Sequence, residues 1–432
     1  MSRTKTQGHD ADEEPDRRCR HLGATLAGRS RLVSSDALES EPDRAGPGLR
    51  VAVVGAGIAG LAVASGLHRL GIHCLVYDEA EGLRLTGAAV TVWPSGFAAL
   101  ARLGVPIEGL GRRIDRLETR SPAGRSLFVI DGERLSRRFG VPAMVVPRRR
   151  LLQRLAEGLP PDSLRFAHAC RTVRPQAAKV SIEFDNGGSD EADLVVGGDG
   201  HRSTVRSSVF GGGPAETTGW AEWQGLSHLS IPLTDGHVSL TIIGKHGACG
   251  LMPAGDGLLQ WWFATPWSSG SPRPLSVVSM LQDRFGSWIS PVPDLLRSIS
   301  DADVNFWPYV RHRVPKSLVA GRVVLIGDAA HAMPPTLAQG ANHALDDAAV
   351  LTHALRSGPV SSALSTYDRS RRRRVTMASR LAARPPAQDT DAASAKLAAA
   401  VPASLSTWCF GSFLRMVSTS LAKTPTHRRP LM

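Results

Sequence analysis

The sequence predicts an α/β fold in which one nucleotide-binding domain is interrupted by a β-sheet domain and followed by a helical region. An apolar strand runs into a glycine turn and a helix over residues 49–70, and the same strand-to-turn pattern returns at residues 322–328. Between them, residues 217–307 contain six or seven short strand-like runs and seven of the nine tryptophans. One domain is therefore split along the chain by another.

These changes in composition and in predicted secondary structure also give the domain boundaries that we expect in this chain of 432 residues. Residues 1–49 are rich in charged residues and serine and show little hydrophobic periodicity, so we predict a disordered extension. The nucleotide-binding domain is assigned to residues 50–210 and 312–380. The inserted, mostly antiparallel sheet domain is assigned to residues 211–311. The Ala- and Arg-rich residues 381–432 predict a C-terminal helical tail.

The formal net charge of +12 does not by itself indicate a nucleic-acid-binding protein, because the charge is local. Residues 1–49 hold 8 Lys or Arg against 9 Asp or Glu, whereas residues 361–432 hold 12 against 3. Arg outnumbers Lys by 45 to 6, which is typical of a GC-rich genome rather than of selection for polyanion binding. We therefore predict no nucleic-acid partner.

Cysteine usage and hydropathy argue against a metal site and a membrane span. The cysteines are scattered, and none forms a CxxC pair. The uncharged, apolar stretch at residues 51–67 has 17 residues, short of the roughly 20 that cross a bilayer. The N-terminus also lacks the apolar core of a signal peptide. We expect a cytoplasmic protein, either a monomer or a homodimer. The five cysteines are Cys19, Cys74, Cys170, Cys249 and Cys409.

The first glycine motif, residues 55–60, lies between an apolar strand and a helix. A lone GxGxxG is a weak signal, but this context indicates a Rossmann-like dinucleotide-binding turn. Gly55 permits the tight turn, Gly57 lets the backbone approach a pyrophosphate, and Gly60 permits close helix–sheet packing. The phosphates would lie at the helix N-terminus. The alternative is a structural strand–turn–helix without a ligand.

An acidic residue at the end of the second strand completes this pattern. Asp78 can accept hydrogen bonds from ribose hydroxyls. We prefer Asp78 to Glu79 for this role, because side chains alternate between the two faces of a strand and Glu79 comes one position too late.

Two further strand-to-turn motifs lie downstream. Residues 193–206 run from a buried strand into the turn Gly198-Asp199-Gly200 and a polar helix start. Residues 327–335 open with Gly327-Asp328 and are followed by residues 339–342. We predict an amphipathic helix from about Asn342, which is a good N-cap residue. Its N-terminus would offer positive potential to an anion.

Together the three motifs resemble those of the class A flavoprotein monooxygenases, the group that includes para-hydroxybenzoate hydroxylase and salicylate hydroxylase. The resemblance covers about residues 50–380. It implies FAD as the cofactor, with NADH or NADPH and O₂ as co-substrates. It further implies a C4a-hydroperoxyflavin that hydroxylates or epoxidises a small aromatic or electron-rich cyclic molecule. In this family the first motif binds FAD, the second serves FAD and NAD(P)H, and the Asp of the third holds the ribityl chain.

The resemblance also assigns individual residues. The segment at residues 85–90 resembles the one that passes the flavin, and residues 145–151 resemble a strand-to-helix element whose Arg contacts FAD. Arg148 aligns best there, with Arg149 and Arg150 as competitors and a solvated helix face as the alternative. Pro335 resembles the proline whose carbonyl lies beside the substrate. The candidate cofactor-binding residues are Gly55, Gly57, Ile58, Ala59, Gly60, Asp78, Gly87, Ala88, Arg148, Asp199, Gly200, Gly327, Asp328, Gln339, Gly340, Ala341 and Asn342.

Three positions depart from the family pattern. Asp78 stands where Glu is usual, Glu79 where Arg is frequent, and Ala338 where many members have Gly. The extra methyl of Ala338 should leave FAD binding intact.

We expect the tryptophan-rich sheet to cover the flavin and to contact the substrate, with Gln224 and Trp261 as candidate pocket residues. Strand alternation would place Trp220 and Gln224 on one face and Trp223 on the other. For any single tryptophan, however, a place in the core is the more frequent outcome. Three histidines inside motifs are interpreted as structural, so no proton-transfer residue is assigned. They are His201, His331 and His343.

Two other classes of function stay open. One is a flavin-dependent halogenase or a reductase on the same fold. Halogenases typically carry a Trp-x-Trp-x-Ile-Pro segment, which this chain lacks. The other is a nucleic-acid-binding or regulatory protein that uses the arginine run at residues 371–374. We interpret that run as a charged helix face.

Overall fold

We describe the protein from a computed structural model that defines residues 48–85, 87–228, 235–356, 358–385 and 400–423. All of these residues belong to one unit of the chain. The extension predicted for residues 1–49 lies outside them except for its last two residues, as does Thr86 of the segment at residues 85–90.

A six-stranded sheet carries the glycine motifs at the ends of its strands. Its order is β18-β19-β12-β1-β2-β8, and all neighbours are parallel except the edge pair β18-β19. The central strand β1 is apolar at every position after Arg50 because both faces of a parallel sheet are covered. The strands are β1 (Arg50–Val54), β2 (His73–Tyr77), β8 (Leu164–Arg165), β12 (Leu194–Gly197), β18 (Val319–Ala320) and β19 (Val323–Leu325).

Helices α1 (Ile58–Arg69), α9 (Gly340–Leu355) and α10 (Val360–Ala382) share the main core with this sheet. Close helix packing depends on small residues, because a Cβ on Gly66 would lie 2.7 Å from side-chain atoms of Leu103 and Thr352. The remaining helices are α2 (Pro94–Arg102), α3 (Gly132–Phe139), α4 (Arg148–Ala156), α5 (Thr204–Phe210), α8 (Gly327–His331), α12 (Ala403–Val417) and α13 (Thr419–Ala422), besides α6 and α7 below.

A seven-stranded sheet forms the second layer, in the order β17-β13-β16-β15-β14-β5-β6. Its neighbours are antiparallel except β14 and β5, so the predicted, mostly antiparallel sheet is confirmed. Two of its strands come from outside residues 211–311, and the domain division at these boundaries stays a prediction. The strands are β5 (Arg116–Arg120), β6 (Ser126–Asp131), β13 (Glu216–His228), β14 (Val238–Gly244), β15 (Gly247–Gly255), β16 (Leu258–Pro266) and β17 (Asn305–Arg311).

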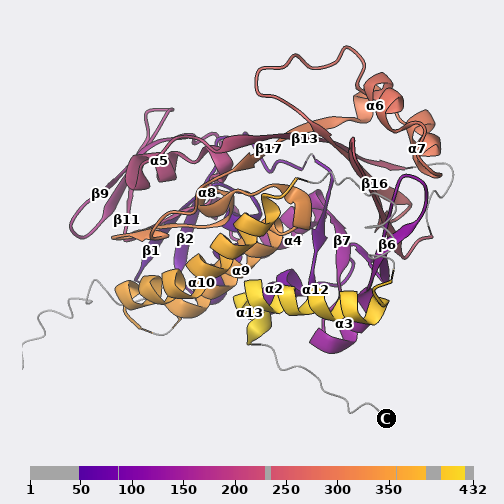
Figure 1. Ribbon diagram of the computed structural model, residues 1–432. Coiled ribbons are helices and arrows are strands. Elements are labelled where there is room, and N and C mark those ends of the chain that lie inside the picture. Colours follow the sequence, from indigo (N-terminus) through magenta and orange to yellow (C-terminus); the bar gives the residue numbers. More distant parts are fainter. Residues whose placement is uncertain (1–47, 86, 229–234, 357, 386–399, 424–432) are drawn as a thin grey trace, which may run out of the picture. The chain divides into compact units, whose positions relative to one another are not determined.

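The six or seven strand-like runs within residues 217–307 do not all form strands. The described part of this region has five strands and two helices, α6 (Val277–Phe285) and α7 (Val292–Ser298). Buried Leu281 and Phe285 are four residues apart, which is helical spacing that short apolar runs conceal. Both helices pack on one face of the sheet in a core with Trp223 and Trp261. Figure 1 shows them together over β13 and β16, apart from α9 and α10.

Two smaller sheets complete the fold. One is β11-β10-β9, formed by Ser189–Ala192, Val180–Phe184 and Cys170–Pro175. The other is β3-β7-β4, formed by Ala89–Val92, Met144–Pro147 and Arg112–Arg113. The predicted C-terminal helical region is confirmed by α12 and α13, where the Phe410 ring lies 4.8 Å from that of Trp93. Among the helices described, none combines the length and hydropathy required to span a bilayer.

Candidate active site

The first motif leaves an open face at the start of α1. Gly55 has φ +102°, and a Cβ there would lie 2.5 Å from the carbonyl oxygen of Gly198. A Cβ on Gly60 would overlap the Gly55 carbonyl, whereas one on Gly57 would meet no atom within 4 Å. Gly55 and Gly60 therefore serve the turn and the packing, and Gly57 leaves room for a ligand against its backbone. Ile58 and Ala59, which begin α1, are buried.

Asp78 lies at the end of β2 and binds the same turn. Its carboxylate accepts hydrogen bonds from Ala56 N at 2.6 Å and Ala80 N at 2.9 Å. Each carboxylate oxygen can accept a further bond, so a ribose hydroxyl can still be accommodated. Glu79 instead points to Arg84 at 2.5 Å and is exposed.

The second motif is stabilised from within. The carboxylate of Asp199 accepts hydrogen bonds from Ser203 Oγ at 2.5 Å and Val205 N at 3.1 Å, at the start of α5. Burial raises the pKa of Asp199, although these hydrogen bonds act in the opposite direction. Gly200 has φ +80° with open space on its Cβ side. The Asp199 side chain thus holds the turn, and the backbone of Gly200 is its open part.

The third motif presents an exposed carboxylate. Asp328 follows β19 in α8, and among the described residues its side chain has no hydrogen-bond partner. A Cβ on Gly340 would lie 3.9 Å from Asp328 Oδ1. Burial lowers the pKa values of Arg148 and His201, and the negative charge of Asp328 opposes this shift at both residues. The structure therefore brings Asp328 close to Gly340 and within the field of Arg148 and His201.

The segment at residues 87–88 is held by Arg148, the favoured member of its arginine run. Arg148 N donates to Ala88 O at 3.1 Å, and a Cβ on Gly87 would lie 3.3 Å from Arg148 Cδ. Arg149 is exposed, and Arg150 pairs with Asp256. Arg148 is thus the one of the three that lies at the turn.

Helix α9 begins earlier than predicted. It starts at Gly340 with Gln339 as the N-cap, so the prediction of Asn342 as a capping residue is wrong. Asn342 is buried, accepts from Trp93 N at 2.9 Å and donates to the carbonyls of Thr91 and Ala338 at 2.9 and 2.8 Å. The Asn342 side chain therefore connects α9 with the junction of β3 and α2. The residues next to Asn342 in the sequence do not indicate this connection. The first turn of α9 holds no acidic residue of its own, and the helix dipole gives this end positive potential.

The turn before α9 contains a buried acceptor without a partner. Gln339 is 1% exposed and donates to Leu337 O at 3.2 Å, while its Oε1 has no partner among the described residues. Ala338 adopts φ +50°, a conformation that favours glycine, at the position where many family members have glycine. Pro335 is exposed, and its carbonyl accepts from Ala338 N at 2.7 Å. The unpaired Gln339 Oε1 and the open face at Gly57 both fit a bound FAD.

A buried ionic network lies behind the third motif, and the sequence analysis missed it. Asp347 accepts from Gly327 N at 2.8 Å and from Arg371 Nε at 2.7 Å, and it contacts His331 Nε2 at 2.6 Å. Burial acts to raise the pKa of Asp347, but the charges and hydrogen bonds of His331 and Arg371 outweigh it, so its pKa lies below the ordinary range. Asp347 thereby anchors the turn that carries Asp328.

The same network corrects the interpretation of the arginine run. Arg371 is fully buried rather than part of a charged surface, and it pairs with both Asp346 and Asp347. Asp346 also accepts from Thr419 N at 2.7 Å, at the start of α13. Two adjacent aspartates in the apolar helix α9 were the available signal, because buried carboxylates require partners.

The inserted sheet meets β3 through a pair of glutamines. Gln260 of β16 accepts from Ala89 N, and its side-chain amide lies 3.1 Å from that of Gln224 of β13. Trp223 and Trp261 lie on the other face, in the core under α6 and α7, so the predicted opposition of Trp223 and Gln224 is confirmed. Trp261 is fully buried there, apart from Gln224, and we assign it no ligand. Gln260 was missed because its register against Gln224 depends on strand pairing.

Glu222 is a buried carboxyl on the same face as Gln224. It accepts from the Tyr309 hydroxyl at 3.0 Å. Burial raises the pKa of Glu222 to about 7, although the bond from Tyr309 opposes the shift. Glu222 therefore changes its protonation state near neutral pH, two residues from Gln224.

The fold and these turns define a flavoprotein hydroxylase, in which an α/β domain with three glycine motifs is joined to an inserted sheet. Residues 48–382 match the family described as FAD binding domain, and the chain belongs to this family.

Relatives of known activity cover most of the chain. The 3-amino-4-hydroxybenzoate 2-monooxygenase PtmB3 of Streptomyces platensis is 33% identical over 348 residues, covering 76% of this chain and 85% of that protein. The FAD-dependent urate hydroxylase of Klebsiella pneumoniae subsp. pneumoniae is 30% identical over 333 residues, covering 76% and 87%. The solved structure of Klebsiella pneumoniae HpxO complexed with FAD and uric acid aligns with a TM-score of 0.74 at 27% identity, covering 87% of this chain and 97% of that one.

Proposed function

We propose that this protein is a cytoplasmic, NAD(P)H-dependent FAD monooxygenase that hydroxylates or epoxidises a small aromatic or heterocyclic molecule. The observation that carries the proposal is the position of Asp328. This carboxylate, which has no hydrogen-bond partner among the described residues, lies beside Gly340 at the N-terminus of α9. Such a pairing suits a ligand that offers hydroxyl donors and an adjoining group that gains negative charge.

Several residues would hold FAD. The backbone at Gly57 would take the pyrophosphate, Asp78 a ribose, and Asp328 the ribityl hydroxyls, while Arg148 would position the segment at residues 87–88 beside the ring. Bound FAD supplies the redox chemistry, in which NAD(P)H, a proton, O₂ and the substrate give NAD(P)⁺, water and a product with one added oxygen atom. The N-terminus of α9 would stabilise negative charge on the reduced cofactor.

The face of the inserted sheet with Gln224 would orient the substrate. Gln224 and Gln260 offer amide donors and acceptors, and the Gln260–Ala89 hydrogen bond places this face directly at β3. The named relatives act on urate and on an aminohydroxybenzoate, which are planar rings with nitrogen and oxygen substituents. We propose the same class here, with the carbonyl of Pro335 beside the ring.

The test is a screen of purified protein against planar ring compounds. We expect noncovalently bound FAD, with a yellow flavin spectrum. We also expect NAD(P)H oxidation that a substrate stimulates, with one O₂ consumed and one hydroxylated product formed per NAD(P)H. Folded protein that shows no flavin spectrum after incubation with FAD would overturn the proposal. Halogenated product formed with chloride or bromide would instead favour a halogenase.

A further inference from the structure

We propose that a basic groove between α3, α10 and the C-terminal helices binds a small ligand that carries several phosphate groups. The groove has a volume of about 850 Å³, within the range of small-molecule sites. None of its lining residues belongs to the FAD motifs. Its cationic residues are Arg138 of α3, Arg369, Arg373 and Arg374 of α10, Arg415 of α12, and Lys423 after α13.

The groove has no negative charge of its own. No acidic residue lines it, and none of its six cations forms an ion pair with a carboxylate in the described part of the chain. Arginines elsewhere are commonly paired, as Arg84 is with Glu79 and Arg154 with Glu157. The groove therefore differs from these paired sites, because its cations come from three separate segments of the chain and lack carboxylate partners among the described residues.

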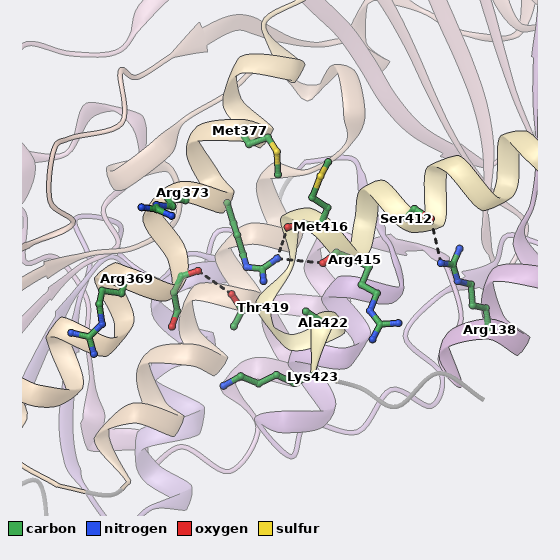
Figure 2. Close-up of a pocket in the computed structure, with 12 residues that line it drawn as sticks. Arg138, Arg369, Arg373, Met377, Ser412, Arg415, Met416, Thr419, Ala422 and Lys423 are labelled. Carbon is green, nitrogen blue, oxygen red and sulfur yellow. Dashed lines mark hydrogen bonds between the residues drawn. The ribbon is translucent and has the colours of Figure 1, made fainter. Parts of the chain in front are cut away.

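Two of the cations are held in place by residues of α12. Arg374 donates to the carbonyls of Arg415, at 3.3 Å, and of Met416, and Arg138 donates to Trp408 O at 3.2 Å and Ser412 Oγ at 3.3 Å. Figure 2 shows the bond between Arg138 and Ser412 of α12. The positions of the two cations are thus set before a ligand arrives, which lowers the entropy lost on binding.

Two of the cations also repel each other. Burial and the nearby charge of Arg415 lower the pKa of Arg138. A bound polyanion would relieve this repulsion. Guanidinium groups suit phosphate in particular, because their planar N–H donors match pairs of phosphate oxygens.

The shape of the groove favours a small ligand over a nucleic acid. In Figure 2, Arg369 and Arg373 lie on α10, across from Arg415 and Lys423 of the C-terminal segment. The cations therefore line both sides of one groove, whereas nucleic-acid sites present a basic stripe or a projecting element. In addition, Arg371 is buried with Asp346 and Asp347, so the run at residues 371–374 is not a continuous basic surface.

The experiment measures tripolyphosphate binding to the full-length, FAD-loaded protein by isothermal titration calorimetry at low ionic strength. The variant Arg369→Gln/Arg373→Gln removes two exposed cations of the groove and keeps helix-forming side chains. The control Arg380→Gln/Arg384→Gln makes the same charge change outside the groove. Competition with NADP⁺ then distinguishes a nucleotide from free polyphosphate as the source of the phosphates.

We expect the groove variant to bind tripolyphosphate about tenfold more weakly or worse, since even one lost charge-assisted contact has that effect. The control should stay within about twofold, and both variants should keep wild-type FAD content, which separates this proposal from the proposed function. Three results would overturn it: no binding by the wild type, equal losses in both variants, or tighter binding of duplex DNA than of tripolyphosphate.

Discussion

Arg371 and Asp347 are both fully buried and are joined by a hydrogen bond of 2.7 Å from Nε to Oδ1. Asp347 also accepts a hydrogen bond from Gly327 N of the third motif. Arg371 also pairs with Asp346, whose carboxylate accepts a hydrogen bond from Thr419 N at the start of α13. This one pair therefore connects the turn of the third motif with the C-terminal helices.

We expect Arg371→Ala to lower the free energy of unfolding by about 3–5 kcal/mol, because two buried carboxylates lose their cation. The adjacent Arg372→Ala removes only a partly exposed ion pair with Asp368 and should cost less than about 1 kcal/mol. Chemical denaturation of the FAD-loaded proteins measures both changes. Similar losses of unfolding free energy in the two variants would show that the buried ion pair stabilises the protein no more than the partly exposed one.

The variant Asp328→Ala should weaken FAD binding by about 10- to 150-fold, because losing a charged hydrogen bond costs about 1.5–3 kcal/mol. Fluorescence titration of the apoprotein with FAD measures the Kd. The control is Asp162→Ala, which removes an exposed carboxylate far along the chain. Unchanged affinity in a folded Asp328→Ala protein would refute the role assigned to this residue.

The variant Gln224→Leu should keep its FAD content but lose about 2- to 12-fold in kcat/KM for the true substrate, or couple oxygen use less tightly to product. A neutral hydrogen bond contributes about 0.5–1.5 kcal/mol, which sets that range. Steady-state kinetics with product quantification provides the measurement, and Thr217→Val at the exposed start of β13 is the control. Normal turnover and coupling would remove Gln224 from the substrate site.

Glu222 should make stability depend on pH in the neutral range. Its pKa of about 7 in the folded protein exceeds the ordinary 4.5, so between these values only the folded state keeps the proton. The free energy of unfolding therefore falls as the pH rises through this window, by on the order of 3 kcal/mol in total.

Glu222→Gln lacks this titration, so its melting temperature relative to wild type should increase from pH 5 to pH 8. Glu216→Gln, at an exposed position of the same strand, should run parallel to wild type throughout. A Glu222→Gln curve that also runs parallel would place the pKa of Glu222 in its ordinary range.

A chain that starts at Gly46 should keep the melting temperature and FAD content of the full-length protein. The composition of residues 1–45 offers too little apolar surface to offset the entropy lost on ordering. Thermal unfolding and flavin absorbance compare the two forms. A large decrease in either quantity would show that this segment packs on the folded part.

Features that depend on local backbone chemistry could be predicted from the sequence. The glycine turns at Gly55 and Gly327, the strands before them and the acidic residue after β2 follow from φ angles and hydrophobic patterns that neighbouring residues impose. The alternation that separates Trp223 from Gln224 is also local, because a strand sends successive side chains to opposite faces.

Features that depend on partners far apart in the chain became visible only once the chain was folded. The sequence could not show that Arg371 is buried while Arg373 is exposed, because that difference comes from Asp346 and Asp347 on another helix. Likewise, the sequence predicts Asn342 as a helix cap. In the structure its side-chain oxygen instead accepts a hydrogen bond from Trp93 N, 249 residues away. Burial forces each polar group to find a partner, and which partner is available depends on how the elements pack.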